Sequence, residues 1–121
     1  MEKETRVQAA GRPSAELVEQ WKAQYGDVYE LSPENEDAAK EGVPEVLYFR
    51  LPGRPELSRM AKTAMTDSLK AFNNLCMDCV LWPDKSALVA VFDKKPGLMI
   101  SLGAKVQQLV GAGLDFTHRR L

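Results

Sequence analysis

The alternation of apolar and polar residues changes period near the middle of the chain. Residues 45–51 are rich in branched and aromatic side chains, which suit a pleated, half-buried strand. Leu47, Phe49 and Leu51 fall on one face, and the opposite face carries Arg50. We therefore expect one buried face and one partly solvated face.

After this strand the apolar residues follow a helical period. The segment 52–55 contains two prolines and a glycine, which end the strand and suit the first turn of a helix. The apolar stripe keeps its phase to Val80, so a single helix of roughly 25 residues fits. Because Thr66 and Asp67 are good N-caps, two helices that meet at a bend there fit as well. The stripe consists of Leu57, Met60, Ala61, Ala64, Met65, Phe72, Leu75, Cys76, Cys79 and Val80.

The first third of the chain predicts a capped helix and a second strand. Ser14 is a suitable N-cap, the apolar positions up to Tyr25 are helically spaced, and Gly26 supplies the stop. Residues 27–31 form a short strand, and the acidic segment 32–44 joins it to the central strand. We expect a β-hairpin with a long loop. The apolar face of the helix consists of Leu17, Val18, Trp21 and Tyr25.

The last third of the chain predicts two further helices. Pro83 ends the central helical pattern. The apolar run 87–92 fits either a strand or a buried helix, and the capping residues Asp84 and Ser86 favour the helix. A final amphipathic helix covers 98–110. The sequence thus predicts an α+β fold with an N-terminal helix, a β-hairpin and a mainly helical C-terminal half.

Length and composition favour one soluble domain. The chain has 121 residues, of which 45% are hydrophobic and 27% charged, values that are ordinary for a globular protein. We expect a flexible tail at 1–12, one domain at 13–113 and a C-terminal tail at 114–121. No apolar run approaches the roughly 20 residues that cross a bilayer. The first residues lack the pattern of a signal peptide, so we expect a cytoplasmic protein that does not enter a membrane.

Charge is unevenly distributed. Residues 1–45 carry 11 acidic and 5 basic side chains, a balance of −6, whereas residues 46–121 carry 11 basic and 6 acidic, a balance of +5. Such asymmetry can steer binding or the stacking of copies, or it can reflect two solvated surfaces. The basic half has no dense cluster interleaved with aromatic residues, so nucleic-acid binding is not expected.

Two cysteines have the spacing of redox and zinc sites. Cys76 and Cys79 form a C-x-x-C pair, but no second pair completes four zinc ligands. The pair also lies late in the predicted helix, whereas a reactive thiol sits near a helix N-terminus. We therefore predict core packing, with thiol or metal chemistry as the alternative.

The other candidate groups do not form a recognised constellation. His118 has no nucleophile or carboxylate pair beside it, and the serines have no triad partners. Five carboxylates near the long loop lack the regular spacing of a calcium site, so we expect them to be solvated. We therefore predict no catalytic residue, cofactor or metal. The five are Glu34, Glu36, Asp37, Glu41 and Glu45.

The apolar and aromatic side chains are more informative. A two-stranded hairpin cannot cover itself and needs helices against at least one face. An aromatic or methionine-rich surface that stays open is a candidate partner site. Core packing is the competing role. The candidate partner-binding residues are Trp21, Tyr25, Tyr29, Tyr48, Met60, Met65 and Trp82.

Three segments resemble the small tail assembly chaperones of tailed bacteriophages and prophages. Residues 21–31, WKAQYGDVYEL, resemble that family's K-x-K-Y-G-x-V-Y-E-I start. Residues 48–55, YFRLPGRP, are similar to its Y-x-R-K-P-D-R turn, and residues 67–76 resemble its D-x-x-K…N-x-C stretch. The loop 32–44 is longer than in the family, and nothing after Trp82 matches the pattern.

The resemblance implies a helper protein that is not an enzyme. Proteins of that family coat the long tape measure protein, keep it soluble and promote polymerisation of the tail tube around it. The implied partners are the tape measure protein and the tail tube protein, and association between copies of the chain is a separate expectation. Two alternatives remain open: a structural or adaptor protein retained in a virion, and a small redox or metal-binding protein that uses Cys76 and Cys79.

Overall fold

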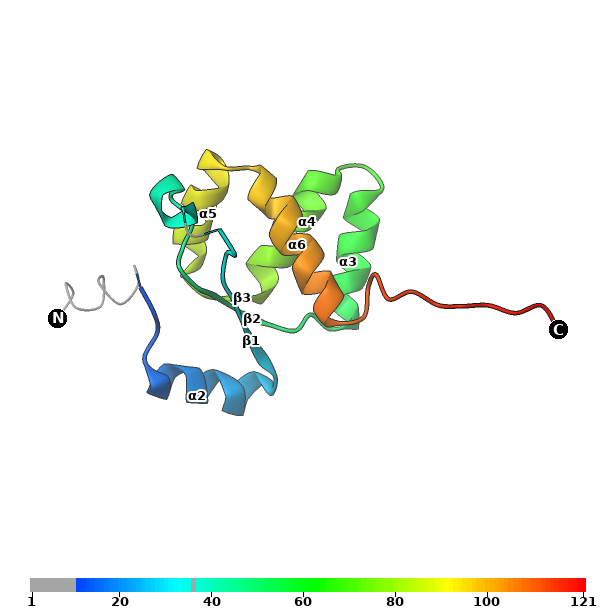
Figure 1. Ribbon diagram of the computed structural model, residues 1–121, viewed down its shortest axis with the longest axis horizontal. Coiled ribbons are helices and arrows are strands. Elements are labelled where there is room, and N and C mark those ends of the chain that lie inside the picture. The colour runs from blue at the N-terminus through cyan, green and yellow to red at the C-terminus, as the bar shows by residue number, and fades with distance from the viewer. Residues whose placement is uncertain (1–10, 36) are drawn as a thin grey trace.

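The computed structural model describes residues 11–35 and 37–121, so most of the predicted N-terminal tail lies outside the described residues. The fold is α+β, with a small antiparallel sheet between α2 on one side and the helices α3–α6 on the other (Figure 1). The elements in chain order are α2 (Ala15–Tyr25), β1 (Val28–Leu31), the 3-10 turn η1 (Ala38–Glu41), β2 (Leu47–Arg50), α3 (Arg54–Ala64), α4 (Ser68–Cys79), β3 (Val80–Trp82), α5 (Lys85–Lys94) and α6 (Gly97–Leu109).

Three helices begin at the N-caps that the sequence predicts. Ser14, Asp67 and Asp84 each accept a hydrogen bond from the backbone N–H three residues further on, at 3.1, 3.0 and 2.9 Å. Asp67 has an extended backbone and separates α3 from α4, so of the two alternatives the pair of helices is correct and the single long helix is wrong. The prediction that residues 87–92 form a helix is confirmed as well.

The sheet has three strands in the order β1-β2-β3, and both pairs are antiparallel. The hairpin of β1 and β2 is confirmed, but the sequence pattern did not predict β3. We placed Val80 in a helix, whereas it is extended and pairs with Phe49. A three-residue strand is too short to show a period of two, and only its pairing with β2 defines it.

The core lies between the sheet and the helices α4, α5 and α6. The helices α4 and α6 approach closely at Gly103, where a Cβ atom would lie only 2.4 Å from Cδ1 of Phe72. Because glycine has no side chain, it allows this contact. The buried core cluster consists of Leu47, Phe49, Leu75, Cys76, Cys79, Val80, Leu88, Phe92 and Val106.

The chain continues beyond α6 as an exposed C-terminal arm. Gly111 and Gly113 have φ angles of 103° and 86°, which suit glycine because a side chain would be strained there. Residues 114–121 are exposed along their whole length. In Figure 1 they run outward from the end of α6.

Candidate functional site: a groove between β1 and α6

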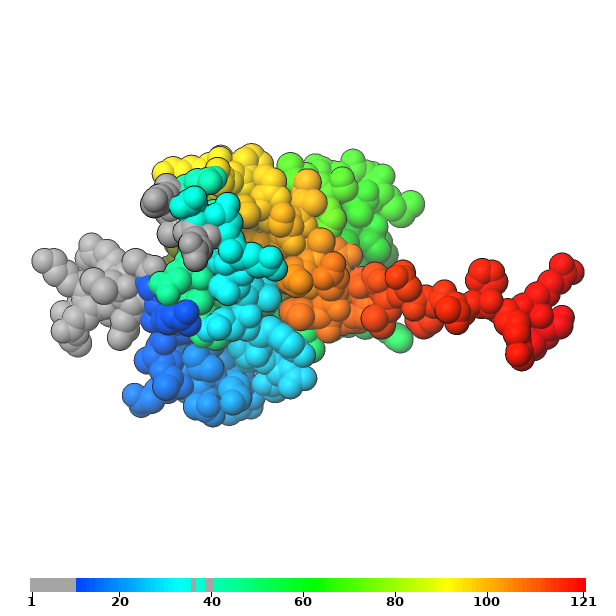
Figure 2. Space-filling view, in the orientation of Figure 1, coloured from blue at the N-terminus to red at the C-terminus, as the bar shows by residue number. Residues whose placement is uncertain are grey.

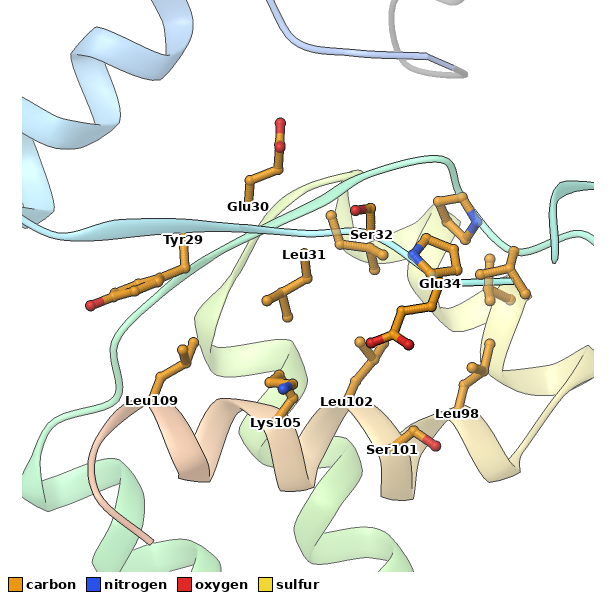
Figure 3. A pocket seen from close by; sticks show the side chains of 15 residues that line it. Tyr29, Glu30, Leu31, Ser32, Glu34, Leu98, Ser101, Leu102, Lys105 and Leu109 are labelled. Atoms are coloured by element: carbon orange, nitrogen blue, oxygen red, sulfur yellow. The ribbon is translucent and has the colours of Figure 1, made fainter. Parts of the chain in front are cut away.

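A groove of about 520 Å³ opens between the edge strand β1 and helix α6 (Figure 3). Strand β1 and the residues after it form one wall, and α6 forms the other. The start of β2 and one residue of α5 complete the lining. The lining residues are Tyr29, Glu30, Leu31, Ser32, Pro33, Glu34, Val43, Pro44, Leu47, Val91, Leu98, Ser101, Leu102, Lys105 and Leu109.

The local sequence explains the apolar character of both walls. On β1, Tyr29 and Leu31 pair with Phe49 and Leu47 and therefore face the helices. On α6, Leu98, Leu102 and Leu109 recur at helical spacing and project toward β1, and Lys105 lies between the last two. Apolar side chains from a strand and a helix thus converge in an open groove.

The outer edge of β1 adds a second binding feature. β1 is a terminal strand of the sheet, and β2 is its only strand neighbour among the described residues. An edge strand presents unpaired backbone N–H and C=O groups to an extended segment. The groove therefore offers apolar surface and backbone hydrogen-bonding groups side by side.

Charged groups occur at the margin of the groove. The Glu34 carboxylate reaches toward α6, where Lys105 projects toward the strand (Figure 3). Glu30 points the other way, and its carboxylate accepts hydrogen bonds from the Tyr48 hydroxyl and from Arg12. The hydrogen bond from Tyr48 to this carboxylate raises the pKa of Tyr48. The groove thus has an apolar floor with one acidic and one basic side chain above it.

Four of the seven candidate partner residues gather on the opposite side of the sheet, beneath α2. The Trp21 and Tyr48 rings lie 5.6 Å apart between centroids, and the Arg50 guanidinium lies 5.9 Å from the Tyr25 ring centre. Trp82 is adjacent to Tyr48 across the β2–β3 ladder. These aromatic contacts hold α2 against the sheet, which indicates a packing role for that group.

The other three candidates are dispersed. Tyr29 lines the groove. Met60 packs against the core cluster, whereas Met65 is 85% exposed at the end of α3. The structure does not bring the seven residues together. Three leucines of the groove, Leu98, Leu102 and Leu109, were visible only as an amphipathic stripe, which we assigned to the last helix without a binding role.

The two cysteines are inaccessible. Cys76 and Cys79 are both 0% exposed and unpaired, so the prediction of core packing is confirmed. Burial raises the pKa of Cys76 to about 12 and that of Cys79 to about 11. A thiol that stays protonated is a weak nucleophile and a poor metal ligand. No group of three or more candidate metal ligands occurs within residues 11–35 and 37–121.

The loop carboxylates do not share a site. Glu41 forms an ion pair with Lys95 at 2.8 Å, and this hydrogen bond lowers the pKa of Glu41. Glu45 is paired with Arg12 at 3.3 Å. Glu36 lies outside the described residues.

In the part of the chain that is described, no helix has the length and apolar character needed to span a membrane.

Comparison with known proteins places this α+β domain in a family. The chain belongs to the family described as "Domain of unknown function (DUF6848)", which matches residues 21–119 and therefore includes most of the C-terminal arm. No curated protein matches the chain.

A solved structure shares the fold. It is described as an uncharacterised protein, rbstp2171, from Bacillus stearothermophilus, and it is 25% identical in sequence with a TM-score of 0.69. The similarity covers 84% of this chain and 99% of the other. Neither description names an activity or a partner.

Proposed function

We propose that this chain is a protein-binding module without enzymatic activity, and that the groove between β1 and α6 holds an apolar segment of a partner protein. The observation that carries the proposal is the groove itself, which has a volume of about 520 Å³ and is lined mainly by leucine, valine and proline. Open apolar grooves of this kind accept the apolar face of an amphipathic helix or an extended peptide.

The groove recognises shape and apolar surface, since its floor is apolar and its charged side chains, Glu34 and Lys105, lie at its margin. A partner helix with leucine-like residues at i, i+4 and i+7 would bury them against Leu31, Leu98 and Leu102. Each fully buried side chain of that kind contributes about 1.5–3 kcal/mol. A few such contacts support weak binding, which repeated sites along a long partner would strengthen.

The class of partner follows from the resemblance to tail assembly chaperones together with this groove. We propose that the chain binds the tape measure protein of a phage or prophage in the host cytoplasm and supports assembly of the tail tube. A long coiled-coil protein exposes apolar stripes before it is enclosed. A chaperone that binds these stripes keeps the protein soluble.

The experiment is co-expression with the tape measure protein encoded in the same gene cluster. We expect the tape measure protein to stay soluble with the wild-type chain and to precipitate with Ser101→Arg, because an arginine at this exposed position fills the groove. Gln108→Arg adds the same charge at an exposed position of α6 outside the groove lining and should leave solubility unchanged.

Precipitation that is the same with and without the chain would refute the proposal. Mass spectrometry of purified particles tests the alternative of a retained virion protein, since a chaperone should be absent from the mature particle. Abundant peptides of this chain in the particle would favour the virion protein.

A further inference from the structure

The C-terminal arm exposes apolar side chains that a soluble domain would normally bury. Leu114 and Phe116 are 67% and 87% exposed, and Leu121 is fully exposed. Figure 2 shows the arm standing clear of the body. Single exposed apolar residues are common, but three within eight residues of an extended arm give that arm an apolar surface that nothing in the described structure covers.

The arm has the pattern of a strand with a basic end. In an extended chain Leu114 and Phe116 project to the same face, because side chains alternate with a period of two. Leu121 falls on the other face. Arg119 and Arg120 follow the apolar pair. The arm thus presents an apolar face at Leu114 and Phe116, with Asp115 on the opposite face, followed by a cationic end.

The groove between β1 and α6 complements this pattern. The groove runs along α6 from Leu98 to Leu109, a rise of about 17 Å. The arm from Leu114 to Arg119 spans about 17 Å when it is extended. The groove has an apolar floor, and the free edge of β1 can pair with one added strand.

Charge contributes to this match through one residue of the groove. Glu34 lines the groove, whereas Glu30 and Glu45 are both paired with Arg12. Glu34 attracts Arg119 and Arg120, whereas Lys105 repels them. The match therefore depends mainly on the apolar floor and on the free edge of β1.

We propose that residues 114–121 of one copy of this chain dock in the β1–α6 groove of a second copy and add a strand to the edge of β1. The arm of the same copy is less suited to its own groove, because it leaves from the Leu109 end of the groove and is directed outward (Figure 1). Returning along α6 would require a full reversal within Val110–Gly113.

Such a contact is heterologous, since the arm of each copy engages the groove of the next. Contacts of this type build open chains or closed rings rather than only dimers. The inference goes beyond the chaperone function and depends only on the groove and the arm. Where the proposed function also holds, the arm and the client compete for one surface, so client binding should dissociate the oligomer.

The first experiment measures the mass of the full chain, without any client, by sedimentation velocity over a wide concentration range. We expect the mass to rise with concentration. Phe116→Ser should weaken self-association roughly tenfold or more, because it removes an aromatic side chain from the buried contact. Ser101→Arg should weaken it to a similar extent by filling the groove. Leu121→Ser, on the other face of the arm, and Gln108→Arg should have little effect.

The second experiment mixes the two defective variants. Phe116→Ser keeps an intact groove, and Ser101→Arg keeps an intact arm, so the mixture retains one functional contact. We expect each variant to be monomeric alone and the equimolar mixture to form a 1:1 heterodimer. Only exchange of the arm between copies predicts this complementation.

Three results would overturn the inference. The first is a wild-type chain that stays monomeric at every concentration, which would leave the arm free or docked on its own groove. The second is self-association that survives Ser101→Arg, and the third is a mixture without heterodimer. Client solubility in co-expression should be retained by Phe116→Ser, so failure of the inference and failure of the chaperone proposal give different results.

Discussion

The two faces of the sheet are built on different physical principles, although they share the same strands. On the side of α4–α6, Phe49 and Val80 are 0% and 7% exposed and pack in the core. On the side of α2, Tyr48 and Trp82 are half-buried beside Arg50. Apolar packing therefore holds the first face against α4–α6, whereas contacts between aromatic rings and with Arg50 hold the second face against α2. We infer that the domain depends on the first face and that α2 is an added layer.

The largest expected difference concerns the thiols beneath the core face. Cys76 and Cys79 should react with an aromatic disulfide reagent roughly 1000-fold more slowly in the native protein than in denaturant, because reaction requires opening of the core. A cysteine introduced by Gln20→Cys, on the exposed side of α2, should react at once. Fast reaction of the native thiols, or metal bound to the purified protein, would support the thiol alternative instead.

The same thiols predict how stability depends on pH. Their pKa values of about 12 and 11 lie above the ordinary value of about 9. The unfolded thiols lose their protons first as the pH rises, so the free energy of unfolding should fall above pH 9. Urea denaturation at a series of pH values measures this. Cys76→Ala, compared with the wild type, should show a weaker decline.

The next largest effect is expected from Phe49→Ala in the core face. Removing this fully buried ring should lower the free energy of unfolding by about 3–5 kcal/mol, as measured by urea denaturation. Strand β2 contacts both neighbouring strands, so the loss should affect the whole domain. A loss below about 1 kcal/mol would show that the core lies elsewhere.

A smaller effect is expected from Gly103→Ala, at the crossing of α4 and α6. Alanine normally stabilises a helix by about 1 kcal/mol relative to glycine. Here the new Cβ would meet Cδ1 of Phe72 at 2.4 Å and its Cβ at 3.1 Å, so we expect a net loss of about 1–3 kcal/mol. Gly97→Ala is the matched control, because no atom lies within 4 Å of its added Cβ. It should be neutral or slightly stabilising.

The smallest effect is expected from Tyr48→Phe on the α2 face. This change removes the hydrogen bond to Glu30 and keeps the ring contact with Trp21, so the loss should stay below about 1.5 kcal/mol. Hydrogen exchange should speed up in α2 and remain unchanged in α4. A loss as large as that of Phe49→Ala would contradict the distinction between the faces.

Local signals in the sequence predicted most of the elements. Ser14, Asp67 and Asp84 act within one helical turn, so their capping role is visible from neighbouring residues alone. The alternation in β2 likewise separated Phe49 from Arg50. Strand β3 was not predicted, because nothing in the sequence near Val80 indicates that β2 will lie beside it.

The groove could be predicted only in part. Tyr29 was among the candidate residues, and Leu98, Leu102 and Leu109 were seen as one apolar stripe. The sequence could not show that this stripe faces β1 across an open space rather than a packed core. Conversely, the aromatic residues Trp21 and Tyr48 suggested a partner surface, but they face each other under α2.

By itself, the sequence determined the α+β class, the N-caps of three helices, the long loop after β1 and the burial of the C-x-x-C pair. These features depend on spacing, capping and turn residues, which act over a few positions. Only the tertiary structure decided the third strand, the close crossing at Gly103 and which apolar surfaces stay uncovered. Those features depend on contacts between segments that are distant in the chain, and the hydrophobic effect that drives them has no preferred direction.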